Sequence, residues 1–282
     1  NFEPSHRIAG FLPEAVAFYQ EIERELGRSF WFPLPILRLA RDEGEWRRIE
    51  RKLERDDVRP WLDQADSVAV PDGWFGAVQL IGGGRLDTRG FLDASREFFA
   101  GHGIYQNTQV PSDSGTASTV WCDGAAGLLS GRHGTHRCAK GEILTIEAGG
   151  WDETHILIGA GGWLVPVGGG RFKVGATYEW SELDSAPTQS GRETVEGIAR
   201  CLGRGSDYTV IAHDAGVRPI LRRSQPYLGP LAGGGWMFNG LGSKGTLYAP
   251  GMARRLARWL CDDIPCEAEF DCRNLPPCHE SD

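Results

Sequence analysis

The sequence predicts a mixed α/β fold in which a parallel α/β part is interleaved with an antiparallel part. Strand patterns alternate with a helix pattern over residues 66–110. Short apolar runs linked by glycine-rich turns follow over residues 140–180. A glycine-rich loop then leads into a helix pattern over residues 239–260. Because these patterns follow one another without a linker, the two parts share the chain in alternation.

The first forty residues predict a helix followed by a strand. Apolar residues recur at intervals of three and four before Gly27, which is typical of an amphipathic helix that ends at a glycine: Leu12, Val16, Tyr19, Ile22 and Leu26. The run 30–40 contains two prolines, which favours an edge strand or a strand entry. We expect a second helix from Glu43 to Arg55.

The next segments indicate parallel strand pairing. Residues 66–70, 76–87 and 103–110 have strand patterns, and residues 88–103 form a helix pattern between the last two. A strand, a helix and another strand predict a βαβ unit. Residues 118–127 form a buried strand pattern that ends in small residues, the usual place for a cofactor in an open α/β sheet.

The second half of the chain indicates an antiparallel sheet. Strand patterns between 140 and 180 are joined by glycine-rich turns. Residues 191–205 predict a helix, and residues 208–220 predict a strand with an elbow.

Composition and charge exclude several classes of protein. The chain has 282 residues, 40% of them hydrophobic and 24% charged, as in ordinary globular proteins. Its net charge of −8 argues against nucleic acid as a partner. The basic run 46–57 alternates in sign at helical spacing, which predicts a solvated helix face. No apolar run is long enough to span a membrane, and we expect a cytoplasmic protein.

The cysteine and histidine patterns predict neither a disulfide scaffold nor a metal site. Seven cysteines are an odd number and too few for a scaffold at this length. His133, His136 and Cys138 have a spacing that suits a metal cluster, but they lack a second cysteine pair nearby. We therefore predict no metal. The remaining histidines considered, His102, His155 and His213, are interpreted as structural.

Three stretches have residues suited to binding chemistry. Gly240, Gly242 and Gly245 leave bare backbone before a helix N-terminus, which suits an anion or an electron-rich ring edge, although such turns are often structural. Arg218 lies between a glycine and Pro219, where its guanidinium can grip a carboxylate or form a surface ion pair. Tyr178 ends a strand pattern and suits either a pocket wall or an ordinary sheet end.

In this order, the three stretches resemble the flavin-dependent oxidoreductases of the D-amino acid oxidase and glycine oxidase family. The matching pieces are Gly175 to Glu179, Gly216 to Pro219 and Gly240 to Pro250, and residues 83–99 and 140–146 are also similar. The resemblance implies FAD as cofactor. It also implies an FAD-binding part at 1–30, 84–139 and 216–282, and a substrate-binding part at 31–83 and 140–215.

The resemblance implies the roles of the candidate residues and the reaction. Arg218 would bind the substrate carboxylate, and Tyr178 would line the pocket. The flavin would contact the loop formed by Gly240, Leu241, Gly242, Ser243, Lys244, Gly245 and Thr246. Family members oxidise an amine to an imine by hydride transfer to flavin N5, a reaction that requires no side-chain acid or base, so we name no catalytic residue. The expected partner is a small amine or amino acid.

Two departures from the family pattern leave alternatives open. Family members open with a βαβ unit carrying G-x-G-x-x-G, and we identify no such sequence in this chain, since the glycines of 80–87 have the wrong spacing; about forty residues of a family member would precede Asn1. Glycine oxidases also carry an arginine where this chain has Ser243, although Lys244 is adjacent. The alternatives to amino acid oxidation are oxidation of a modified-base amine on RNA and a non-catalytic fragment of such an enzyme.

Overall fold

The structure is a computed structural model that describes residues 6–56, 58–63, 68–110, 116–134, 136–203, 205, 207–221 and 225–275. The chain divides into two compact units that alternate along the sequence. Unit 1 contains Asn1–Gly10, Trp31–Leu86 and Lys140–Gly216, and unit 2 contains Phe11–Phe30, Asp87–Ala139 and Val217–Asp282. The mixed α/β fold is confirmed, whereas the ligand that each unit binds stays a prediction.

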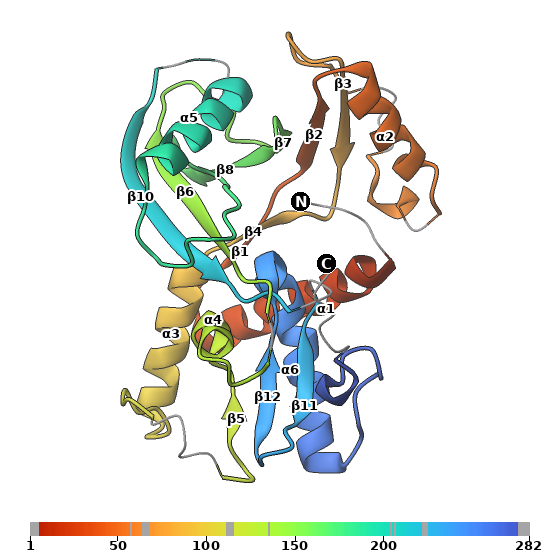
Figure 1. The fold of residues 1–282 in the computed structure, drawn as a ribbon. Coiled ribbons are helices and arrows are strands. Elements are labelled where there is room, and N and C mark those ends of the chain that lie inside the picture. The colour runs from red at the N-terminus through yellow and green to blue at the C-terminus, as the bar shows by residue number, and fades with distance from the viewer. Residues whose placement is uncertain are drawn as a thin grey trace. The chain divides into compact units, whose positions relative to one another are not determined.

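Unit 1 is built on a sheet of seven described strands in the order β10-β6-β9-β8-β7-β2-β3 (Figure 1). The strands are β2 (Ile36–Ala40), β3 (Gly76–Leu80), β6 (Ala139–Glu147), β7 (Ile156–Gly159), β8 (Gly162–Gly168), β9 (Arg171–Gly175) and β10 (Thr209–Arg218). Strands β7, β8 and β9 pair antiparallel through short turns, as the glycine-rich pattern predicts, and β6 pairs antiparallel with β9. Strands β2 and β7 pair in parallel.

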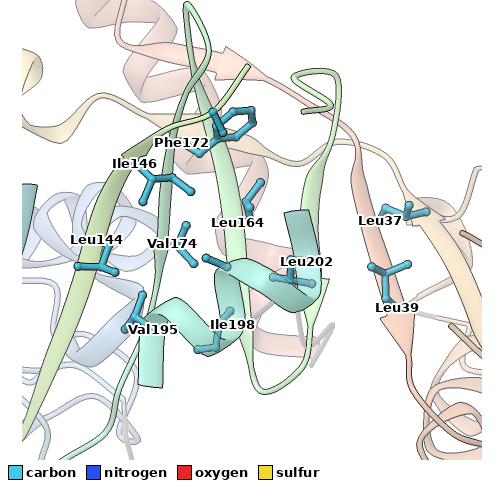
Figure 2. Packing of buried hydrophobic residues seen from close by; sticks show 12 residues of the cluster. Leu37, Leu39, Leu144, Ile146, Leu164, Phe172, Val174, Val195, Ile198 and Leu202 are labelled. Carbon is cyan, nitrogen blue, oxygen red and sulfur yellow. The ribbon is translucent and has the colours of Figure 1, made fainter. Parts of the chain in front are cut away.

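The core of unit 1 lies between this sheet and helix α5 (Gln189–Gly203). Alternate residues of β6, β8 and β9 turn one face of the sheet toward the helix, because successive side chains of a strand point to opposite faces. Figure 2 shows Leu144, Leu164 and Val174 facing Val195 and Ile198 of α5. Helix α2 (Glu43–Leu53) and the two-stranded sheet of β1 (Trp31–Pro33) and β4 (Gly84–Leu86) complete the described elements near β2.

Unit 2 contains a smaller sheet of three described strands in the order β11-β12-β5. These are β5 (Val120–Trp121), β11 (Tyr227–Pro230) and β12 (Trp236–Asn239), and β12 pairs in parallel with β5. Helix α6 (Gly245–Asp262) packs on the sheet through Met252, Leu256 and Trp259, together with Phe11 from helix α1 (His6–Leu26). Helices α3 (Thr88–Gly101) and α4 (Gly124–Leu129) belong to the same unit.

Two strand predictions are wrong. Residues 103–110 form no strand; every residue there is exposed, and the predicted βαβ unit fails with them. Residues 68–70 are not a strand, and residues 66 and 67 lie outside the described residues.

The proline run 30–40 agrees with its prediction. Pro33 ends β1, an edge strand of the two-stranded sheet, and Pro35 directly precedes β2. Strand β2 itself pairs with β3 and β7 on its two sides.

Among the described residues, no helix is both long enough and apolar enough to cross a membrane. No group of three or more metal-binding side chains gathers there either. His133 Nε2 lies 2.9 Å from Asp123, whereas His136 Nδ1 accepts a hydrogen bond from the backbone N–H of Cys138. The two histidines of the candidate cluster therefore have different partners.

Candidate active site

The elbow after β10 and the glycine loop after β12 are joined in unit 2. Arg218 is the last residue of β10 and is partly buried, and Pro219 follows it. The carbonyl of Pro219 accepts a hydrogen bond of 2.9 Å from Gly242 N–H. On the other side, the carbonyl of Ile220 accepts one of 2.8 Å from Arg137 N–H. The structure therefore brings together two of the three stretches that the sequence singled out.

Different structural constraints explain why glycine occupies the three loop positions. Gly240 has φ +81°, and a Cβ there would lie 2.9 Å from Leu221 Cδ1 and 3.1 Å from the carbonyl oxygen of Gln225. Gly242 has φ +57°, a left-handed conformation that glycine adopts readily, but a Cβ would meet only Ile220 at 3.6 Å. Packing and backbone conformation therefore account for Gly240 and Gly242.

Gly245 lacks both of these reasons. Its φ of −54° is helical, and a Cβ would meet only Leu241 Cβ, at an ordinary 3.7 Å. Glycine weakens a helix relative to alanine, so nothing in the described chain favours it here. A glycine at this place leaves room for a group from outside the chain.

The N-terminus of α6 is an electropositive end without a side-chain cap. The cap residue, Lys244, makes no capping hydrogen bond with its side chain. The first N–H groups of a helix have no acceptor within the helix, and the helix dipole places positive charge there. Tyr19 Oη donates to the carbonyl of Thr246 at 2.8 Å, and burial raises the pKa of this phenol to about 12. The first turn of α6 is thus anchored and remains suited to an anionic or electron-rich group.

A buried polar network holds the start of the loop. Asn239 is 2% exposed; its Oδ1 accepts from Gly240 N–H at 2.7 Å, and its Nδ2 donates to Asp123 Oδ1 and to the Gly124 carbonyl, each at 3.0 Å. Asp123 lies two residues after the end of β5, so the network ties the loop to the end of the neighbouring parallel strand. The predicted cofactor edge at 118–127 lies in this network.

Asp123 also gathers positive groups. Arg132 Nε lies 3.2 Å from Asp123 Oδ2, and the Arg132 guanidinium stacks on the Trp121 ring at 3.7 Å. Gly127 permits this arrangement, because a Cβ there would lie 2.0 Å from the carboxyl carbon of Asp123. The sequence analysis did not identify Asp123 or Asn239 as site residues.

The loop glycines have the spacing G-x-G-x-x-G, which the sequence analysis missed. Gly240, Gly242 and Gly245 follow strand β12 and precede helix α6. The dinucleotide-binding fingerprint lies within a βαβ unit, and among the described residues no strand follows α6. The spacing therefore does not by itself assign a phosphate site to this loop.

Tyr178 belongs to unit 1, in the segment that follows β9. Its side chain is 49% exposed, and its ring lies 5.8 Å from the Trp180 ring. The neighbouring Glu179 carboxylate accepts hydrogen bonds from Ser181 and from the backbone N–H of Trp180, and these bonds lower its pKa. Arg218 and the glycine loop lie in unit 2, so the role of Tyr178 as a pocket wall stays a prediction.

The fold defines a mixed α/β protein with one large, mostly antiparallel sheet and one small sheet on which helix α6 packs. A family model described as "FAD dependent oxidoreductase" matches residues 2–259, and the chain belongs to this family. This match confirms the predicted family and its cofactor, FAD.

Similar proteins agree with the family. The chain is 30% identical over 121 residues to a glycine oxidase of Pseudomonas aeruginosa, a match that covers 42% of this chain and 33% of that protein. It is 25% identical over 278 residues to the tRNA 5-methylaminomethyl-2-thiouridine biosynthesis bifunctional protein MnmC of Methylibium petroleiphilum, with 76% of this chain and 41% of that protein covered. The chain thus spans about a third of the length of the curated glycine oxidase and about two fifths of the bifunctional protein.

Solved structures share the fold. Glycine oxidase from Geobacillus kaustophilus superposes with a TM-score of 0.77 at 21% identity, covering 94% of this chain and 81% of that one. Iminodiacetate oxidase from Chelativorans sp. BNC1 superposes with a TM-score of 0.71 at 21% identity, covering 91% and 82%. At this identity the likeness shows the fold alone.

The residues of the loop fit a flavin cofactor. Gly245 leaves space that a Cβ would fill, at the point where the 3₁₀ turn Gly242–Lys244 leads into α6. The N–H groups of Gly242 and Lys244 donate to the carbonyls of Pro219 and Leu241, so the cofactor would be held by the other backbone groups of Leu241 to Thr246.

Proposed function

We propose that this protein is an FAD-dependent oxidoreductase that oxidises an amino acid or a related amine. The observation that carries the proposal is the hydrogen bond between Gly242 N–H and the carbonyl of Pro219, since it links the backbone suited to the cofactor with the elbow that bears Arg218. When bound, FAD would supply the redox chemistry by accepting the electrons of the oxidised carbon.

In this proposal the chain binds and orients the substrate. Arg218 would hold a carboxylate through two parallel hydrogen bonds, which fixes both the position and the plane of the bound group. Its place at the end of β10, before the rigid Pro219, restricts the directions available to the side chain. The required task is orientation of the amine-bearing carbon, which lowers the barrier without an acid or a base from the chain.

Arg218→Ala tests this role. We expect the KM for the amino acid to rise by about tenfold or more, since a hydrogen bond to a charged group contributes roughly 1.5–3 kcal/mol. The FAD-loaded protein is reduced anaerobically by each of a panel of amino acids, and the loss of flavin absorbance measures the reduction. Arg171→Ala is a matched control, because Arg171 lies at the exposed start of β9 and pairs with Glu147. An unchanged KM in Arg218→Ala would remove Arg218 from substrate binding.

A second candidate function is oxidation of a modified-base amine on RNA. The similarity to the bifunctional tRNA-modifying protein supports it, because that match covers 76% of this chain. The net charge of −8 opposes it, since RNA-binding surfaces concentrate lysine and arginine. Reduction of the flavin by tRNA that bears an aminomethylated base, but by none of the free amino acids, would favour the second function over the first.

A further inference from the structure

A cleft of about 590 Å³ lies in unit 1 between helix α2 and strands β2 and β3. Its volume is in the range of small-molecule sites. Its floor is apolar and includes Ile49, Val78 and Leu80. None of its lining residues belongs to the candidate active site.

Arg38 is the unusual residue of this cleft. It lies in the middle of β2, where it is paired in register with Val78 of β3 and Ile158 of β7. Its neighbours Leu37 and Leu39 point into the core under α5, so Arg38 points to the opposite face and lines the cleft. The position is an interior strand of the sheet, where a charged side chain is uncommon.

The guanidinium of Arg38 has no partner within the part of the chain that the structure describes. The residue is partly buried, and no hydrogen bond or ion pair with a described residue engages its side chain. Its nitrogens are not among the buried side-chain atoms without a partner, so its donors are reachable from the cleft. A guanidinium carries five N–H donors, and an anion that entered the cleft could accept from them.

The rim of the cleft adds further positive charge. Arg48, Arg51 and Lys52 of α2 line it, and among the described lining residues Glu45 alone is acidic. Glu45 is already engaged, since it accepts a hydrogen bond of 2.9 Å from Arg41 N–H and lies 3.8 Å from Arg41 Nε. Arg48, Arg51 and Lys52 are exposed, as predicted for this basic run, and they also line the cleft.

We propose that this cleft binds an amphipathic anion, with an apolar chain or ring on the floor and a single carboxylate or phosphate head at Arg38. Both heads match the fork of a guanidinium. Apolar contact with Ile49, Val78 and Leu80 supplies the remaining affinity and excludes small inorganic anions as the preferred ligand.

Calorimetric titration of the full chain tests the proposal with three compounds of equal chain length. Octanoate and octyl phosphate carry the two anionic heads, and octyl glucoside is the uncharged control, each used below its micelle concentration. We expect one-to-one binding of at least one anion, weakened by salt, and binding at least about tenfold weaker for octyl glucoside and for inorganic phosphate. The tighter anion identifies the head group. Absence of binding by both anions, or equal binding of octyl glucoside, overturns the proposal.

Substitutions of arginine test which side chains hold the anion. Arg38→Gln is expected to weaken anion binding by about tenfold or more, and Arg48→Gln to weaken it in the same direction. Arg47→Gln is the control, because Arg47 pairs with Glu43 and does not line the cleft. If Arg38→Gln fails to fold, Arg48→Gln against Arg47→Gln decides. Equal affinity in the lining variant and the control overturns the assignment. The titration needs no amine oxidation, so its outcome is independent of the proposed function.

Discussion

The two units treat their buried polar groups differently. In unit 1, the buried Glu142 carboxylate accepts hydrogen bonds from Thr188 N–H, Thr188 Oγ1 and His213 Nε2, and the buried Lys140 Nζ donates to Asp184 at 2.6 Å. In unit 2, His133 Nδ1 is buried and has no hydrogen-bond partner among the described residues.

The backbones of the two units also differ. Each of the seven described strands of unit 1 pairs with a neighbour, and one face of the sheet is covered by α5. In unit 2, a glycine loop with Gly240 and Gly242 in left-handed conformations leads from strand β12 into helix α6. Unit 1 thus provides a sheet core with a cleft beside α2, whereas unit 2 provides the backbone loop of the candidate active site.

The largest expected effect is in the core of unit 1. Phe172 is fully buried in β9 and packs in the α5 core (Figure 2). Phe172→Ala should lower the free energy of unfolding by about 3–5 kcal/mol, because it removes apolar contact and leaves a cavity. Chemical denaturation measures this change. The elbow at Arg218 and the glycine loop belong to unit 2 and should keep their contacts. FAD affinity measured below the unfolding transition should therefore not change. A parallel loss of FAD affinity would show that the core of unit 1 also determines cofactor binding.

The second effect concerns the Glu142 network. Burial disfavours ionisation of Glu142, but the hydrogen bonds from Thr188 and His213 outweigh burial and lower its pKa. A carboxyl whose pKa is lower in the folded state stabilises the fold above its unfolded pKa of about 4.3, and this contribution is lost as the pH falls through the folded pKa.

Glu142→Gln isolates that contribution. At pH 7 the variant should lose about 1–3 kcal/mol of unfolding free energy, since it leaves His213 without its charged partner. The difference between wild type and variant should shrink as the pH falls below the unfolded pKa. Urea denaturation of both proteins at a series of pH values measures it, and a difference that grows toward acid pH would contradict the sign of the shift.

The loop glycines give the sharpest comparison within unit 2. Gly240→Ala should destabilise the protein by about 1–2 kcal/mol, because the left-handed conformation is unfavourable for alanine. Gly245→Ala should leave the stability unchanged or slightly raised, because its conformation is helical. If a cofactor lies against Gly245, the same change should weaken FAD binding, which a fluorescence titration measures. A Gly245→Ala protein that binds FAD as the wild type does would remove the cofactor from this part of the loop.

Local patterns were sufficient to predict the elements that depend on neighbouring residues. The antiparallel strands follow from alternating apolar residues between glycine turns, and α1 and α5 follow from helical spacing. Residues 103–110 were misread because Ile104, Tyr105 and Val110 suit a strand, yet the structure leaves them 70%, 41% and 56% exposed. A strand requires a partner backbone, and a single sequence does not specify one.

Of the candidate site, likewise, only the local motifs could be read from the sequence. The glycine loop and the elbow are visible as local motifs, whereas the hydrogen bond between Asn239 and Asp123 joins residues 116 positions apart. The cleft at Arg38 also depends on tertiary structure, because its described lining residues come from α2, β2 and β3. Such contacts arise from tertiary structure, and spacing along the chain does not reveal them.

The smallest expected effect is at the surface of unit 2. Arg28, after α1, donates to Glu97 of α3 at 2.8 Å, but the two side chains are 52% and 62% exposed. Water screens such a pair and its side chains lose conformational freedom, so Arg28→Ala should change the unfolding free energy by less than about 1 kcal/mol. Thermal unfolding at low and high salt measures it, and the small difference should vanish at high salt. A larger loss would mean that unit 2 depends on surface charge for its stability. The two units would then differ in what stabilises them as well as in their buried polar groups.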